Sequence, residues 1–135
     1  MAGYSGTPLP KKLGIKPGFK VALPDLSPEV KSELKTALSQ CRDASSAKTT
    51  LDFVLLPSKS QSDLKKKFPH WSKRLAPSGM LWVSWPKKSS GLATDLDENK
   101  VREIGLAAGL VDVKVCAINA VWSGLKFVIR VKDRA

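Results

Sequence analysis

The sequence predicts one α/β domain over residues 1–135, built on a mainly parallel sheet of five strands. Strand-like apolar runs alternate with helical stretches along most of the chain, and this alternation is typical of parallel sheets. Residues 51–56 and 80–85 are almost continuously apolar, as strands buried on both faces are. With 135 residues, 42% of them hydrophobic, the chain is long enough to bury one core.

The first elements follow from local signals. Residues 1–18 are rich in glycine and proline and are expected to form an N-terminal arm. Residues 19–23 favour a short strand. A helix follows, because Ser27 is a good N-cap and Pro28 suits the first helical position. Its apolar residues recur at helical spacing, and the helix should end near Ser39.

The middle of the chain alternates between strand and helix. Residues 40–50 are small and polar and predict a loop, and residues 51–56 predict a buried strand. A short helix is expected over residues 63–67. Because proline is disfavoured inside a helix, Pro69 should start a separate turn. Residues 80–85 then form the central strand.

One helix and two strands complete the domain. Thr94 is the expected N-cap of the helix, and Gly109 suits the position just beyond its end. Residues 111–117 and 125–131 alternate apolar and polar residues across a short connector, so these two strands should pair antiparallel. The negative charges expected in the first turn of the helix are Asp95, Asp97 and Glu98.

The basic loop after the central strand is the main candidate site, because ligands of open α/β sheets collect at the carboxyl ends of strands. Two ammonium groups, two hydroxyls and a permissive glycine suit a phosphate or carboxylate. The alternative is a solvated basic turn. The candidate anion-binding residues are Lys87, Lys88, Ser89, Ser90 and Gly91; Asp25, Ser58, Lys59 and Ser60, at the ends of neighbouring strands, and Trp122 could join them. The leading hypothesis is a non-catalytic protein that binds an anionic ligand or partner there.

The net charge of +11 favours polyanionic partners, so a nucleic-acid-associated protein is the second hypothesis. A secondary basic patch comprises Lys65, Lys66, Lys67, Lys73 and Arg74. Phe68 and Trp71 lie among these cations and could stack on bases. The alternative is that both rings are core anchors and the lysines are merely solvated.

Several classes of site are not expected. His70 is the only histidine and has no cysteine, glutamate or second histidine at ligand spacing, so no metal site is predicted. Cys41 and Cys116 are expected to be reduced thiols. No catalytic set and no cofactor are predicted. The chain lacks an apolar run near 18 residues, so no membrane span is expected, and the N-terminus lacks a secretory pattern. A cytoplasmic location is the expectation.

Eight segments of the chain look familiar as a set. They are residues 3–9, 11–15, 75–77, 79–83, 85–91, 94–96, 109–116 and 122–126. Together they resemble a small bacterial family known only as a domain of unknown function. The resemblance covers nearly the whole chain and implies a bacterial, cytoplasmic origin, but it implies no reaction.

The succession of elements also resembles the second half of class I methyltransferases, where a Pro-x-Gly turn leads into a central strand and a β-hairpin closes the sheet. This resemblance implies a Rossmann-like fold with strand order 1-2-3-5-4 and the last strand antiparallel. Such enzymes cradle a nucleoside cofactor with a glycine-rich turn after the first strand, whereas residues 24–28 contain no glycine. A diverged methyltransferase-like enzyme is therefore the third hypothesis.

The strand order has a consequence for the helices. If three strands succeed one another in one direction, right-handed crossovers place every helix on the same face. Strands as apolar as residues 51–56 and 80–85 cannot leave the other face in water. We expect the N-terminal arm to cover part of that face and a homodimer contact to cover the rest. A flavodoxin-like order, 2-1-3-5-4, would remove the need for either.

Overall fold

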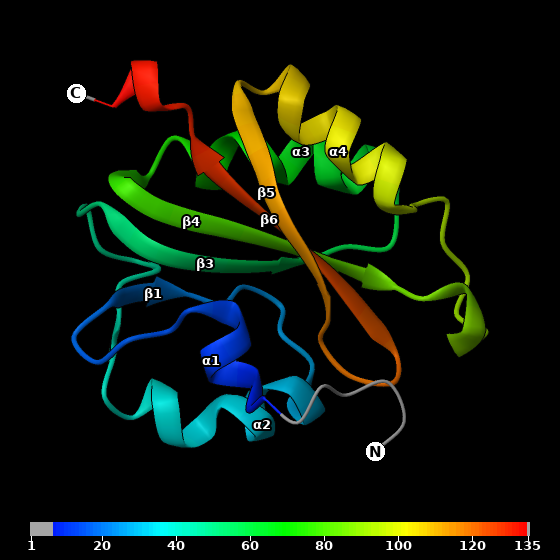
Figure 1. Cartoon of the computed structure of the whole chain (residues 1–135), viewed down its shortest axis with the longest axis horizontal. Coiled ribbons are helices and arrows are strands. Elements are labelled where there is room, and N and C mark those ends of the chain that lie inside the picture. Colours follow the sequence, from blue (N-terminus) through cyan, green and yellow to red (C-terminus); the bar gives the residue numbers. More distant parts are fainter. Residues whose placement is uncertain (1–6, 135) are drawn as a thin grey trace.

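The computed structural model describes residues 7–134 and contains one six-stranded sheet with the order β2-β1-β3-β4-β6-β5 (Figure 1). The strands β1 to β4 are parallel, and β6 is antiparallel to both β4 and β5. The predicted order of the five expected strands is confirmed, with the short β2 added at the edge. The strands are β1 (Lys20–Ala22), β2 (Arg42–Asp43), β3 (Leu51–Pro57), β4 (Leu75–Pro86), β5 (Leu110–Ala117) and β6 (Trp122–Ile129).

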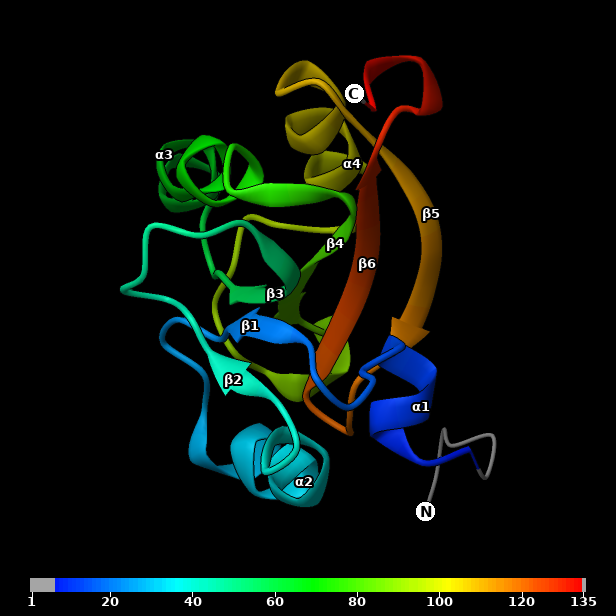
Figure 2. The same cartoon turned by 90° about the vertical axis from the view of Figure 1, so that its left-hand side faces the viewer.

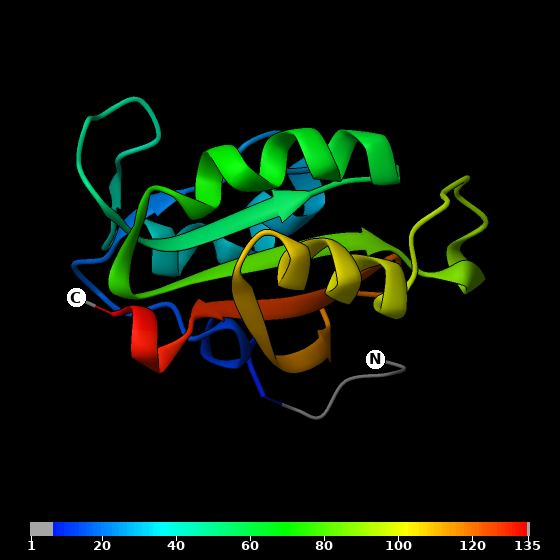
Figure 3. The same cartoon turned by 90° about the horizontal axis from the view of Figure 1, so that it is seen from above.

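Helices cover both faces of the sheet (Figure 2). One face carries α3 and α4, which lie side by side (Figure 3), and the other carries α1 and α2. The helices are α1 (Leu9–Leu13), α2 (Pro28–Leu38), α3 (Gln61–Ser72) and α4 (Glu98–Ala107). Within residues 7–134, every helix is too short or too polar to cross a lipid bilayer.

The position of α2 overturns the prediction that all helices share one face. The chain leaves β1, forms α2 and returns as β2 on the side of β1 away from β3. A right-handed crossover in that direction places its helix opposite to α3, whose crossover runs from β3 toward β4. The placement of α2 on the other face follows from the short strand β2, in which Arg42 and Asp43 pair with Lys20 and Val21 of β1. A second subunit is therefore not needed to cover the sheet.

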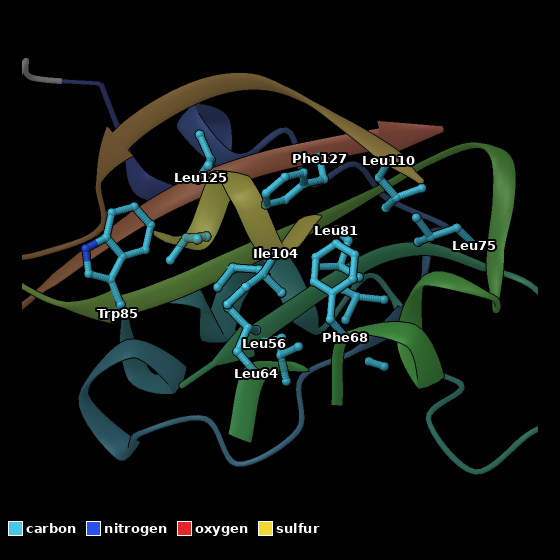
Figure 4. Close-up of a cluster of buried hydrophobic side chains, with 14 of the residues drawn as sticks. Leu56, Leu64, Phe68, Leu75, Leu81, Trp85, Ile104, Leu110, Leu125 and Phe127 are labelled. Atoms are coloured by element: carbon cyan, nitrogen blue, oxygen red, sulfur yellow. The ribbon is translucent and has the colours of Figure 1, made fainter. Parts of the chain in front are cut away.

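The core between the sheet and the α3–α4 layer is the larger of two (Figure 4). Phe68 of α3 and Phe127 of β6 meet edge to face, with ring centroids 5.2 Å apart. Leu81 and Leu56 are also fully buried in this layer, and Ile104 of α4 packs beside them. Such ring pairs add stabilisation beyond the apolar area that they bury.

A second core lies under α1 and α2 and is centred on Trp82 of β4. Its indole is fully buried, and Nε1–H donates a 2.9 Å hydrogen bond to the carbonyl of Leu13 in α1. Phe53 and Leu55 of β3 and Leu34 of α2 complete the layer. The expectation that the N-terminal arm covers part of this face is thus met by α1.

The observed N-cap is the predicted residue at α2 and a different residue at α4. Ser27 caps α2 as predicted, since its Oγ accepts the N–H of Val30. At α4 the cap is Asp97, not Thr94, and Asp97 accepts the N–H of Lys100 at 2.8 Å. Thr94 instead donates a 2.6 Å hydrogen bond to the carbonyl of Lys59. Gly109 follows α4 with φ 99°, as its predicted role requires.

The prediction of a break at Pro69 was wrong, because α3 is one helix with Pro69 inside it. Pro69 lies in the last turn and costs only one backbone hydrogen bond, to the carbonyl of Lys65. The next strand, β4, starts earlier than predicted and contains a bulge, so that Leu51 and Phe53 pair with Leu75 and Met80. Gly79 is required there, since a Cβ would lie 2.6 Å from the Leu51 carbonyl oxygen.

Candidate functional site

The sheet has a switch point between β1 and β3. From β1 the chain crosses over one face and moves outward, whereas from β3 it crosses over the other face toward β4. The two connections diverge and leave a crevice at the carboxyl ends of these strands, which is where open α/β sheets bind ligands. A cavity of about 520 Å³ occupies this place, within the ordinary size range of small-molecule sites. We call it the switch-point cavity.

The lining of the switch-point cavity combines polar and apolar groups. Four serines, two aspartates and a lysine supply the polar groups, and Leu26, Val30, Pro57 and Trp122 supply the apolar groups. Ser84 is buried at 3% exposure in the apolar second half of β4. The complete lining is Asp25, Leu26, Ser27, Val30, Pro57, Ser58, Lys59, Ser60, Asp63, Ser84 and Trp122.

Both α2 and α3 begin at the cavity, through their caps Ser27 and Ser60. Each cap hydroxyl accepts a backbone N–H of its own helix, from Val30 and from Asp63. The helix dipoles therefore direct their positive ends toward this region. A third contact stabilises the start of α3, since the carboxylate of Asp95 accepts the N–H of Gln61 at 2.8 Å.

One lysine joins the two carboxylates of the cavity. Nζ of Lys67 lies 3.2 Å from Oδ2 of Asp25 and 3.1 Å from Oδ1 of Asp63, so it ties the β1–α2 loop to α3. Asp25 has φ 54°, a conformation that few residues other than glycine adopt. Burial acts to raise the pKa of Asp63, but hydrogen bonds from Ser58 and Lys67 outweigh it, and the pKa is lowered.

We expect the carboxyl of Asp63 to titrate below its ordinary pKa of 3.8. A depressed pKa in the folded state means that its stabilising contribution is present above the unfolded value and lost as pH falls through the folded one. A ¹³C NMR titration of the side-chain carboxyl measures this midpoint. Ser58→Ala and Lys67→Ala should each raise it. A midpoint that does not move in either variant would contradict these contacts.

The loop predicted as the main anion site lies at the same edge of the sheet but outside this cavity. Residues 88–90 form a short 3₁₀ turn, and Gly91 ends it with φ 77°. The N–H of Lys87 donates a 2.8 Å hydrogen bond to the carbonyl of Val121, next to Trp122. Ser90 uses its hydroxyl locally, donating to the carbonyl of Lys87 at 2.6 Å. None of residues 87–91 lines the switch-point cavity.

The structure divides the predicted basic patch. Phe68 is fully buried and Trp71 packs against the same core, so these rings act mainly as core anchors. Lys67 is ion-paired, and Arg74 donates hydrogen bonds to the carbonyls of residues 44, 45, 47 and 49. Lys65, Lys66 and Lys73 remain exposed.

The structure brings together the residues that the sequence placed at neighbouring strand ends. Asp25, Ser58, Lys59 and Ser60 all line the switch-point cavity, and Trp122 joins them from β6 rather than from a turn. Ser84 and Asp63 were missed; a polar residue in an apolar strand was the available signal for Ser84. Within residues 7–134, no group of three or more histidine, cysteine, aspartate or glutamate residues is arranged to hold a metal ion.

Comparison with solved structures shows the fold. Magnesium protoporphyrin IX methyltransferase (ChlM) from Synechocystis PCC 6803 with bound SAH has 15% sequence identity and a TM-score of 0.58, with 84% of this chain and 75% of that chain covered. A TehB-like SAM-dependent methyltransferase from Corynebacterium glutamicum ATCC 13032 Kitasato has 11% identity and a TM-score of 0.57, with 96% and 91% covered. The fold is therefore that of class I methyltransferases.

Comparison of the sequence gives the family. No curated protein matches the chain. One family model matches residues 10–131, and its description is "Protein of unknown function (DUF3052)". The match covers almost all of the part of the chain that the structure describes. The chain therefore belongs to the DUF3052 family.

Proposed function

We propose that this protein binds a small polar ligand in the switch-point cavity and acts as a binding protein rather than as a catalyst. The observation that carries the proposal is the position of the cavity at the divergence of β1 and β3, where the fold itself creates a crevice. Ligands of this fold class occupy such crevices without any dedicated insertion.

The lining indicates the kind of ligand. The apolar surface of Leu26, Val30 and Trp122 suits a ring system, and the serine hydroxyls suit its polar groups. The starts of α2 and α3 favour an anionic group such as a carboxylate or phosphate. Nucleosides that carry such a group combine these features. S-adenosyl compounds are the first candidates, because the similar structures include methyltransferases with bound SAH and SAM.

Two features favour binding over methyl transfer. Asp63 is paired with Lys67 and has a lowered pKa, and a carboxylate with a lowered pKa is a weak general base. The connection from β1 to α2 contains one proline, Pro24, and no glycine, so the backbone cannot approach a cofactor as closely as a glycine-rich turn does. A diverged transferase remains the competing hypothesis, and production of SAH from SAM would establish it.

Calorimetric titration and thermal shift with S-adenosylmethionine, S-adenosylhomocysteine and a nucleotide panel test the proposal. A ligand at 100 times its Kd should raise the free energy of unfolding by about 2.7 kcal/mol. Leu26→Trp fills the cavity and should remove this gain. Leu92→Trp, the same change at an exposed leucine outside the cavity, should keep it. The proposal fails if no member of the panel binds, or if both variants bind equally well.

We further propose that the basic loop of residues 87–91 attracts the anionic group of the ligand toward this edge. The loop begins three residues after Ser84, and Lys88 is exposed. The double variant Lys87→Ala/Lys88→Ala should weaken binding moderately, and more at low salt than at high salt, because exposed charges are screened. An equal effect at both salt concentrations would argue against such long-range attraction.

A further inference from the structure

A second hollow lies away from the switch-point cavity, at the other end of α3. It is formed by the loop between β2 and β3 and by the C-terminal end of α3, and its volume is about 520 Å³. Its lining residues are Ser45, Ser46, Ala47, Lys48, Thr49, Thr50, His70, Lys73 and Arg74. We call it the loop hollow. Since α3 has 12 residues, the two sites are separated by about 18 Å of helix.

The loop hollow is lined by cations without a carboxylate. Lys48, Lys73 and Arg74 contribute three positive charges, and Nζ of Lys20 lies 3.4 Å from Oγ1 of Thr50 at its margin. Asp43, the acid that precedes the loop, accepts hydrogen bonds from the N–H and hydroxyl of Ser45. Arg74 forms no ion pair within residues 7–134, so no acid neutralises its charge there.

Arg74 also occupies the backbone carbonyls of the loop as hydrogen-bond acceptors. Its guanidinium donates to the carbonyls of Ala44, Ser45 and Ala47 at 2.6–2.7 Å and to that of Thr49 at 3.3 Å. The loop therefore curves around the Arg74 guanidinium, with these carbonyl oxygens directed toward it. Within the described chain, the N–H groups of Ser46, Lys48 and Thr49 donate no hydrogen bond. Three backbone donors in one exposed loop, beside three cations, are the groups that a phosphate requires.

We propose that the loop hollow binds a phosphate group through the N–H groups of residues 46, 48 and 49 and the side chains of Lys48 and Lys73. Arg74 positions the loop and adds its charge. Hydroxyls of Ser46 and Thr49 complete the set of donors around the oxygens. This site is independent of the switch-point cavity, because the two share no lining residue.

The test is an NMR titration of the full chain with inorganic phosphate, read at the backbone amides of Ser46, Lys48 and Thr49. Saturable shifts at these amides are expected. Lys48→Ala/Lys73→Ala should weaken binding by about tenfold or more, as expected for loss of charge-assisted contacts. Lys35→Ala/Lys132→Ala removes the same net charge at exposed positions outside both hollows and should leave the affinity unchanged. Both pairs are exposed or half-exposed, so the fold should persist.

A second titration, with a short single-stranded oligonucleotide, separates two sources of the phosphate. If the site holds a polynucleotide backbone, the oligonucleotide should bind more tightly than inorganic phosphate, and its affinity should fall steeply with salt. If it holds a single phosphate group, inorganic phosphate should compete for the same amides. The proposal is overturned if these amides do not shift with either probe, or if both double variants lose affinity equally.

Discussion

Trp82→Ala is expected to lower the free energy of unfolding by about 3–5 kcal/mol, the range for removing a large buried aromatic ring. Trp82 is fully buried in the core under α1 and α2, and its indole N–H donates a hydrogen bond to the carbonyl of Leu13 in α1. Its loss leaves a cavity and also removes one of the contacts between α1 and the sheet. Urea unfolding followed by circular dichroism measures the change.

Trp82→Phe separates the ring from the hydrogen bond. Phenylalanine keeps most of the apolar volume but leaves the carbonyl of Leu13 without the indole N–H, at a cost of about 1–3 kcal/mol. This variant should therefore lose clearly less stability than Trp82→Ala. Equal losses in both variants would mean that the hydrogen bond, not the packing, dominates at this position.

Gly105→Ala should destabilise the protein by about 1–3 kcal/mol, although the same change in an exposed helix stabilises by about 1 kcal/mol. A Cβ on Gly105 in α4 would lie 2.0 Å from Cε1 of Phe127. The ring cannot simply withdraw, because Phe127 is fully buried and packs edge to face against Phe68. Overpacking in a close-packed core forces side chains out of their rotamers.

A double-mutant cycle identifies the cause of this loss. Phe127→Leu removes the edge of the ring that the new methyl group would meet, so Gly105→Ala should cost less in that background than in the natural protein. Coupling energies between residues in contact reach about 0.5–3 kcal/mol. If the two changes are simply additive, the steric explanation for Gly105 is wrong.

The fold could be predicted from the sequence because its main strands carry strong local signals. Residues 51–56 and 80–85 are apolar enough to be recognised as buried strands, and the hairpin of β5 and β6 follows from alternation across a short connector. The strand β2 could not be predicted in this way. It has two exposed, charged residues, and so short a segment shows neither apolar alternation nor turn signals.

Because β2 is not predicted from the sequence, the switch point between β1 and β3 is not predicted either. Without β2, the sequence places α2 on the wrong face of the sheet. Tertiary contacts decided two further details. Thr94 and Asp97 both have side chains that suit an N-cap. The Thr94 hydroxyl instead donates a hydrogen bond to the carbonyl of Lys59, and Asp97 caps the helix. Pro69 is tolerated because it falls in the last turn of α3.

The shortest strand of the sheet, β2, determines where one wall of the switch-point cavity lies. Pairing of β2 with β1 is what keeps α2, and with it one wall of the switch-point cavity, on its own face. Pairing over two edge residues opens at a free energy far below that of global unfolding, while β3, β4 and β6 stay intact. We expect an occupant that contacts both the β1–α2 loop and the end of β3 to oppose this opening. Binding would then make the β2 edge of the sheet more rigid without changing its conformation.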